Sequence, residues 1–327
     1  MATPSSTFTE MVTTTDRAWG SSVTDNVSEH NALCNRLKKK GKIKTVSGGY
    51  EIAEPLDYAE NSTYQRYSGY ESLNTGASDV LTSAKYPFQQ VALHVTASGR
   101  EIRMNSGKQA MINLVKARKA NAKRTAANNF SVDVYSDGTL TNQIGGLSNI
   151  IQTAGTGTVG GINSSTYTFW KNQFKEMTGT NLAASPSAAN AVSMKADMNS
   201  LWLSLNRGAD KPDMIVATHD LYSLYELGEQ QLQRYADADL AKAGFTGLKY
   251  KSADILFDDN SNFGTTDELA YFLNTDYLGI TQHKEAQWTM DAEKTPTNQD
   301  AVVIPMYWMG NMVCTNRSLQ GVLFDAA

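Results

Sequence analysis

The sequence is poor in cysteine and has no long apolar run. It contains two cysteines, Cys34 and Cys314, in 327 residues, and they form neither a CxxC pair nor a zinc-binding pattern. Isolated cysteines of this kind are most often small buried hydrophobes in a reducing cytosol. No apolar stretch approaches the ~20 residues that span a bilayer, and the N-terminus lacks a basic start followed by an apolar run. The sequence therefore indicates neither a membrane protein nor a secretory signal.

Charged residues are also scarce. They make up 19% of the chain, and the net charge is −4 with a pI of about 5.6. A nucleic-acid-binding domain is usually basic, so the whole chain lacks that electrostatic signature. Ser, Thr, Asn and Ala take the place of the missing charges. Such a composition suits a surface that contacts other copies or partners, although a loop-rich soluble protein has the same composition.

No arrangement of residues indicates an enzyme. The four histidines occur in no HExxH motif and the chain has no GxSxG motif; they are His30, His94, His219 and His283. Asp220 is most simply an acid at a helix N-terminus, and Asp258-Asp259 end a strand before a turn. We therefore predict no catalytic residue, no cofactor and no metal ligand.

Gly155, Gly157 and Gly160 match the pattern GxGxxG. A dinucleotide site needs a strand before these glycines and a helix that begins among them, so that its N-terminus meets the pyrophosphate. Here no helix can begin before Ser164. The segment is better interpreted as a flexible crossing between subdomains.

The hydrophobic pattern predicts an α+β protein without regular βαβ alternation. Helices are predicted over 22–40, 106–129, 166–177, 187–207 and 219–230. Strands are predicted over 87–97, 130–134, 212–218, 254–259, 269–274 and within 301–325. A β-hairpin is expected over 42–56, turning at Ser47-Gly48-Gly49.

The helix over 106–129 carries a basic run without an intervening acid, made of Lys108, Lys116, Arg118, Lys119, Lys123 and Arg124. This face could meet a phosphate backbone, or it could be a solvated face that pairs with carboxylates. The acidic balance of the chain favours the solvated face. We expect the opposite side to lie against a sheet through Met111, Leu114 and Val115.

Two segments lack a core pattern but hold aromatic residues. Residues 57–80 are polar and contain Tyr58, Tyr64, Tyr67 and Tyr70. Tyrosine suits interfaces because its ring buries area while its hydroxyl stays paired; an ordinary long loop is the alternative. Residues 1–21 are rich in Ser and Thr, and anchors such as Phe8 and Trp19 indicate an extended arm that needs a neighbour.

Taken in order, several segments resemble the major capsid proteins of tailed double-stranded DNA phages, which share the Hong Kong 97-type fold. They are STFTEMVTTTDRAW, NALCNRLKKKGKIKTVSGGYEIAEPLDYAENSTYQRYSGYESL, TAGTGTVGGINSSTYTFWKNQF, PDMIVATHDLYSLYE, YKSADILFDD, YFLNTDYLGI and NMVCTNRSLQGVLFD. They cover nearly the whole chain, and it is their order together that carries the resemblance.

The resemblance implies an arm, an extended β loop, a peripheral domain with a long spine helix, and an axial domain. It divides the chain into an arm and helix at 1–41, a hairpin and extended loop at 42–85, a peripheral domain at 86–140, an axial domain at 141–300 and closing strands at 301–327. It implies a subunit of hexamers and pentamers in an icosahedral phage head, with Tyr64, Tyr67, Tyr70, Phe8 and Trp19 as expected intersubunit contacts.

The partners that the resemblance implies are other copies of the chain, a separate scaffolding protein, a portal and a cementing protein. The shell would enclose double-stranded DNA without sequence-specific binding, in a virion assembled in the bacterial cytoplasm. Another phage subunit, such as a tail-tube or ring protein, is the alternative. A DNA-binding protein led by the basic helix, and an enzyme, are further alternatives with less support.

Overall fold

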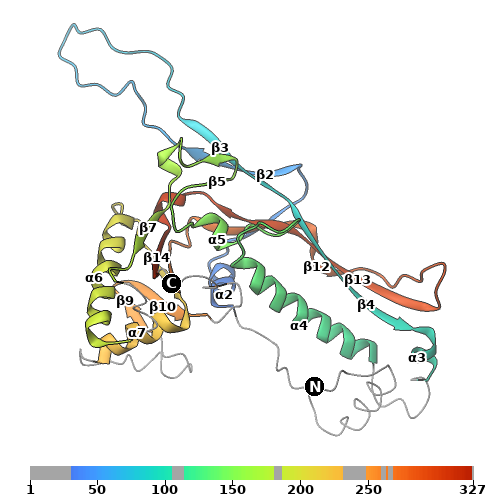
Figure 1. Cartoon of the computed structure of the whole chain (residues 1–327). Helices are drawn as coiled ribbons and strands as arrows, with labels where there is room; N and C mark the ends of the chain where they lie inside the picture. Colours follow the sequence, from blue (N-terminus) through green and yellow to red (C-terminus); the bar gives the residue numbers. More distant parts are fainter. Residues whose placement is uncertain are drawn as a thin grey trace.

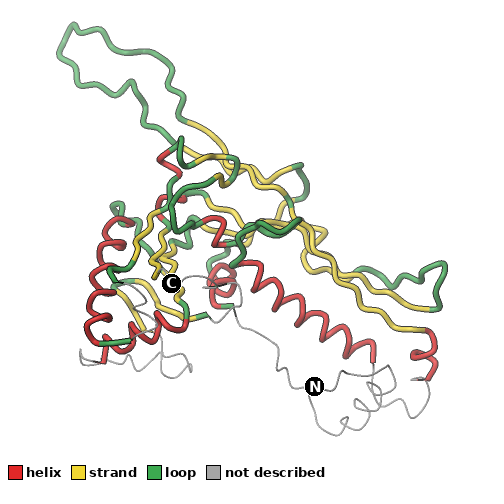
Figure 2. The backbone as a smooth tube through the Cα atoms, viewed as in Figure 1, coloured by secondary structure: helices red, strands yellow, loops and turns green. Residues whose placement is uncertain are grey.

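We describe the protein from a computed structural model, which describes residues 31–104, 114–179, 186–230, 248–258, 263 and 268–325. Figure 1 shows three parts: a long twisted sheet with one helix along it, a second sheet flanked by two helices, and a ribbon that ends in a projecting loop. The same arrangement coloured by secondary structure is seen in Figure 2. The molecule is a mixture of helices and sheets, as the hydrophobic pattern predicts.

The long sheet joins distant parts of the sequence. Its strands lie in the order β1 (Ile43–Val46), β12 (Leu278–Met290), β13 (Ala301–Cys314) and β4 (Gln89–Ser98). β1 is parallel to β12, whereas β13 is antiparallel to both of its neighbours.

One helix, α4 (Leu114–Val134), packs along this sheet at β4. Ala122 is buried in a cluster with Val95 of β4 and Ile304 of β13. The prediction that this helix lies against a sheet is confirmed. The side chains of Met111, Leu114 and Val115 lie outside the described residues, so their contacts stay a prediction.

The second sheet has six strands. They lie in the order β7 (Gln173–Glu176), β14 (Gly321–Asp325), β11 (Glu268–Leu273), β8 (Met214–Ala217), β10 (Ala253–Phe257) and β9 (Leu248–Tyr250). Helices α6 (Ala188–Leu205) and α7 (His219–Gln230) share a core with Ile215, while Met214 and Val216 belong to the larger central core. This alternation places the two helices against one face of the sheet. The predictions of both helices and of β8, β10 and β11 are confirmed.

The central core lies where the two sheets meet. It includes helix α2 (Ala32–Lys39), whose Leu33 and Leu37 are fully buried, and the short helix α5 (Leu147–Ile150). Asn31 caps α2, because its side-chain oxygen accepts a hydrogen bond from the backbone N–H of Cys34 at 2.9 Å. Of the helix predicted over 22–40, residues 22–30 lie outside the described part.

The hairpin predicted over 42–56 is wrong. β1 does not pair with β2 (Glu51–Asp57); it pairs with β12, and β2 pairs with β3 (Leu81–Pro87) to form a separate two-stranded ribbon. The Ser47-Gly48-Gly49 turn therefore moves the chain from one sheet to another. The residues at 47–49 do predict a turn, but a turn does not determine which strands pair. The partners of β1 and β2 come from more distant parts of the sequence.

Two other local predictions are also wrong. Residues 130–134, predicted as a strand, form the last turns of α4, because Val134 is buried in the central core and Phe130 packs against it. Residues 166–177, predicted as a helix, form the 3-10 turn η1 (Thr168–Trp170) and the strand β7, which pairs with β14. In both segments tertiary packing overrides local propensity.

Candidate assembly surface

The projecting loop stands on a ribbon that is anchored at one face. Along β2 the side chains of Ile52, Glu54 and Leu56 are buried while the residues between them are not. Ala84 and Tyr86 of β3 meet the same core. Glu54 is buried beside a cation, since Lys44 Nζ lies 3.1 Å from its carboxylate. The anchored face fixes the direction in which the ribbon leaves the body.

Two contacts hold the base of the ribbon. The Tyr86 hydroxyl donates to the backbone carbonyl of Cys314 at 2.9 Å and accepts from its N–H at 3.3 Å, and burial raises the pKa of Tyr86. The backbone N–H of Lys85 donates to the carbonyl of Gly160 at 2.9 Å. The body therefore holds β3 through backbone and side-chain hydrogen bonds.

Gly160 explains the glycine-rich passage. It lies in the turn between β5 (Thr158–Val159) and β6 (Ile162–Asn163), with φ +60°. A Cβ atom at Gly160 would lie 2.9 Å from the Cβ of Ala84, so only glycine fits against the ribbon. No helix begins among the glycines. The passage is a support for the ribbon, a role that sequence reasoning missed because nothing in the sequence places Gly160 beside Ala84.

The loop over 58–80 has no helix or strand, and polar side chains join its two sides. The Ser62 and Ser78 hydroxyls lie 2.6 Å apart, and Gln65 Nε2 donates to the carbonyl of Ser72 at 3.2 Å. These bonds narrow the loop without giving it an apolar core. Figure 1 shows it extending away from both sheets.

The expected contact tyrosines are exposed in the single chain. Tyr64, Tyr67 and Tyr70 have exposed fractions of 82%, 64% and 108%. They do not pack on the core of their own subunit, which leaves their rings available to another surface. Phe8 and Trp19, the other expected contacts, lie outside the described residues.

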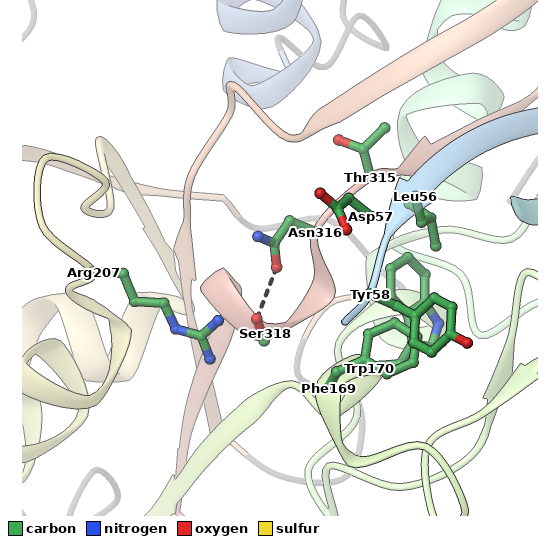
Figure 3. Close-up of a pocket in the computed structure, with 9 residues that line it drawn as sticks. All are labelled: Leu56, Asp57, Tyr58, Phe169, Trp170, Arg207, Thr315, Asn316 and Ser318. Carbon is green, nitrogen blue, oxygen red and sulfur yellow. Dashed lines mark hydrogen bonds between the residues drawn. The ribbon is translucent and has the colours of Figure 1, made fainter. Parts of the chain in front are cut away.

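A small hollow of about 160 Å³ lies where the loop joins the body. Figure 3 shows Tyr58, Phe169 and Trp170 grouped on one side of it and Arg207 on the other. The remaining lining residues are Leu56, Asp57, Thr315, Asn316 and Ser318. The Ser318 hydroxyl donates to Asn316 Oδ1 at 2.8 Å, and among the described residues no histidine lines the hollow.

The basic face of α4 is partly paired. Arg118 Nη1 lies 3.0 Å from Glu101 Oε2 of α3 (Gly99–Met104), and the two side chains are 20% and 7% exposed. The hydrogen bond from Arg118 lowers the pKa of Glu101. Lys123 is exposed. This supports the interpretation of a solvated and paired face, while Lys108 and the side chain of Lys116 lie outside the described residues.

The titratable residues singled out in the sequence are spread over the molecule. His219 Nδ1 contacts the carboxylate of the adjacent Asp220 at the exposed start of α7, and Asp258 accepts from the Tyr135 hydroxyl at 2.8 Å. His30 and Asp259 lie outside the described residues. Within the described ranges no group of three or more metal-ligating side chains occurs, and no helix is long and apolar enough to cross a membrane.

Cys314 is a buried thiol, as expected from its isolation in the sequence, whereas Cys34 is only partly buried at the edge of the central core. Burial raises the pKa of Cys34 and of Cys314 to about 12. A raised pKa disfavours the thiolate, which is the nucleophilic form of cysteine.

The fold recurs in solved shell structures. The chain is similar to the capsid of Myoviridae phage XM1 (TM-score 0.60, 12% identity, 93% of this chain and 94% of that chain). It is also similar to the capsid of cyanophage A-1(L) (TM-score 0.62, 15% identity, 93% and 95%). A third similar structure is the SrpI encapsulin complex from Synechococcus elongatus PCC 7942 (TM-score 0.57, 8% identity, 95% and 94%).

No protein-family model matches the sequence, and no curated protein sequence matches it significantly. The structural likeness over nearly the whole chain shows the fold. The protein has the Hong Kong 97-type fold that the sequence resemblance predicts.

Proposed function

We propose that the protein is the major capsid protein of a tailed double-stranded DNA phage, a structural subunit and not an enzyme. The observation that carries the proposal is the fold, which matches phage capsid chains along 93% of this chain. The projecting loop with its three exposed tyrosines supports it, because such rings suit an interface. The three neighbours reported above are capsid or encapsulin structures, which gives the tail-tube alternative no support.

In this proposal the subunit forms the hexamers and pentamers of an icosahedral head that encloses DNA. Tyr64, Tyr67 and Tyr70 contact the adjacent subunit, and Phe8 and Trp19 anchor the arm on another. Each subunit buries well over ~2,000 Å² across its interfaces, as obligate assemblies do. A scaffolding protein, a portal and a cementing protein are its expected partners, and the virion is its location.

The test is to image the purified protein, expressed alone and with the scaffolding protein of its genome, by negative-stain electron microscopy. Closed icosahedral shells are the expected result. Tubes or open rings would replace the proposal with a tail-tube or ring subunit. A DNA-binding assay across salt gives a second measure: a steep salt slope of the unassembled subunit would instead indicate a phosphate-binding protein led by α4.

A further inference from the structure

Most of the outer edge of β4 lacks the usual devices that protect a sheet edge in the part of the chain that the structure describes. β4 is ten residues long, and among the described strands only β13 pairs with it. Its pairing with β13 runs without a bulge from Gln89 to Ser98. The sequence QQVALHVTAS contains no charged residue and no proline. Soluble proteins normally protect such an edge with charge, proline, a bulge or a covering segment.

Hydrogen bonds from side chains show which backbone groups of β4 point away from β13. The backbone N–H of Ser98 donates to Glu101 Oε2 at 3.0 Å, and the carbonyl of Thr96 accepts from Arg118 Nη1 at 2.9 Å. In an antiparallel pair the N–H and C=O of one residue point to the same side, and the side alternates along the strand. The backbone N–H and C=O groups of the even-numbered residues of β4 therefore point to the open edge.

This alternation divides the edge into two parts. Glu101 and Arg118 cover the end at Ser98 and Thr96, while Gln90, Ala92 and His94 present their backbone groups without a partner strand among the described residues. Their side chains are exposed, and none of the three is an aspartate, glutamate, lysine or arginine. An edge of this kind accepts an added strand through main-chain hydrogen bonds.

The composition of the N-terminal segment suits a strand that could pair with this open edge. Residues 7–15, TFTEMVTTT, hold five threonines with Phe8 and Val12, and Glu10 is their one charge. Thr, Val and Phe favour strands. The 30 residues before Asn31 can extend about 100 Å at ~3.3 Å per residue, well beyond a compact body whose radius of gyration is about 20 Å.

We propose that residues 7–15 of a neighbouring copy add to the outer edge of β4 as a fifth strand, opposite Gln90, Ala92 and His94. The donor is a neighbour because an arm that paired with its own β4 would add nothing to assembly, whereas an exchanged strand adds main-chain bonds at each contact. This inference rests on the proposed shell function and names the surface that receives the arm.

Ala92→Pro tests the receiving edge. Proline removes the N–H of Ala92, which points outward, so it removes one edge donor and no bond to β13. Ala92→Ser is the matched control, since it keeps the N–H. Provided that circular dichroism shows a folded subunit, Ala92→Pro and deletion of residues 2–18 each reduce the yield of closed shells, and the two together cause no further loss. Normal shells from both variants would overturn the inference.

A crosslinking experiment tests the donor and does not depend on Ala92→Pro folding. Chains carrying Val12→Cys are mixed with chains carrying Ala92→Cys, assembled and oxidised. Both chains also carry Cys34→Ser, because Cys34 is only partly buried and Cys314 is the buried native thiol. Met11→Cys is the matched control, because adjacent side chains of a strand point to opposite faces. Only one of residues 11 and 12 can lie on the same face of the sheet as Ala92. We therefore expect disulfide-linked dimers with either Val12→Cys or Met11→Cys, but not with both.

Each other outcome of the mixing experiment has a definite meaning. If shells form but mixed chains never link, the arm does not occupy this edge. If the mixed chains do not link, but a further variant that carries both Val12→Cys and Ala92→Cys forms a disulfide within one chain, the strand comes from the same copy and the exchange is wrong. If the wild-type protein forms no shells under any condition, it is the proposed function that fails.

Discussion

At the scale of single residues, the long sheet depends on the absence of a side chain at Gly310. Gly310 pairs with Gln282 where the register of β12 shifts. A Cβ atom there would lie 2.4 Å from the carbonyl oxygen of Thr281 and 2.9 Å from the ring of Trp308. Trp308 is itself buried against Phe130, with ring centroids 5.0 Å apart. A methyl group at this position would therefore press on the backbone of β12 and on a buried ring.

Gly310→Ala should therefore destabilise the subunit by about 1–3 kcal/mol, the usual cost of overpacking. Urea denaturation of the unassembled subunit measures this, with tryptophan fluorescence as the probe. Gly48→Ala is the matched control, because a Cβ at Gly48 meets nothing within 4 Å. Equal stabilities of the two variants would mean that the bulge in β12 relaxes around the new methyl group.

At the scale of elements, one ion pair ties α3 to α4 across the tip of the long sheet. Glu101 accepts from Arg118 Nη1 at 3.0 Å and also from the backbone N–H of Ser98 at the end of β4. Its side chain is nearly buried. Three elements therefore meet at a single carboxylate. A second pair at the tip, between Arg103 and Asp300, is 2.9 Å long but mostly exposed.

Glu101→Gln should cost about 2 kcal/mol, the typical value of hydrogen bonds to a charged group, while Asp300→Asn should cost less than about 1 kcal/mol because exposed pairs are screened. The hydrogen bond from Arg118 lowers the pKa of Glu101 in the folded state. The stabilisation is therefore present above the unfolded value of about 4.3 and is lost as the pH falls through the folded pKa. Urea denaturation at pH 7 and in acid measures both effects. A Glu101→Gln cost that does not shrink in acid would contradict the role of the charge.

The elements also show what could be predicted from the sequence. Helix α6 was found because Ala191, Met194, Met198, Leu201 and Leu205 follow a helical period and all are buried against the second sheet. The hairpin at 42–56 failed because β1 finds its partner 237 residues later, at Ile280 opposite Ile43. No local pattern reports such a pairing.

The assembly surface was predicted only in part. The tyrosines of the loop could be recognised as exposed because residues 58–80 have too few aliphatic side chains to form a core. The open edge of β4 could not be recognised, because the sequence of a strand does not show which other strands lie beside it. The same holds for Gly160, whose neighbour Ala84 lies far away in the chain.

At the scale of the whole molecule, the projecting loop lies outside the core that the two sheets share. The ribbon carries the loop away from both sheets, as Figure 1 shows. Exposed aromatic rings on a projecting loop contribute little stabilisation in water, but they contribute much when they are buried in a contact with an apolar centre and a polar rim. The shape favours an assembly in which each loop lies on a neighbour.

The loop gives the most direct test of this assembly. Changing Tyr67 and Tyr70 together to Ser should leave the isolated subunit folded, because the two rings are 64% and 108% exposed and contribute nothing to its core. Circular dichroism and urea denaturation should match the wild type. Shell formation should fall sharply, because interface aromatics carry much of the binding energy and each can cost more than 2 kcal/mol when truncated. Sedimentation and negative-stain imaging measure the yield of particles.

Tyr50→Ser is the matched control for this double variant. Tyr50 is 97% exposed but lies in the turn between β1 and β2, outside the projecting loop, so it tests whether removal of any exposed ring impairs assembly. A loss in the double variant with normal shells from Tyr50→Ser would assign the contact to the loop. Normal particles from the Tyr67 and Tyr70 variant would contradict the assignment, because a contact centred on these rings cannot survive the loss of both.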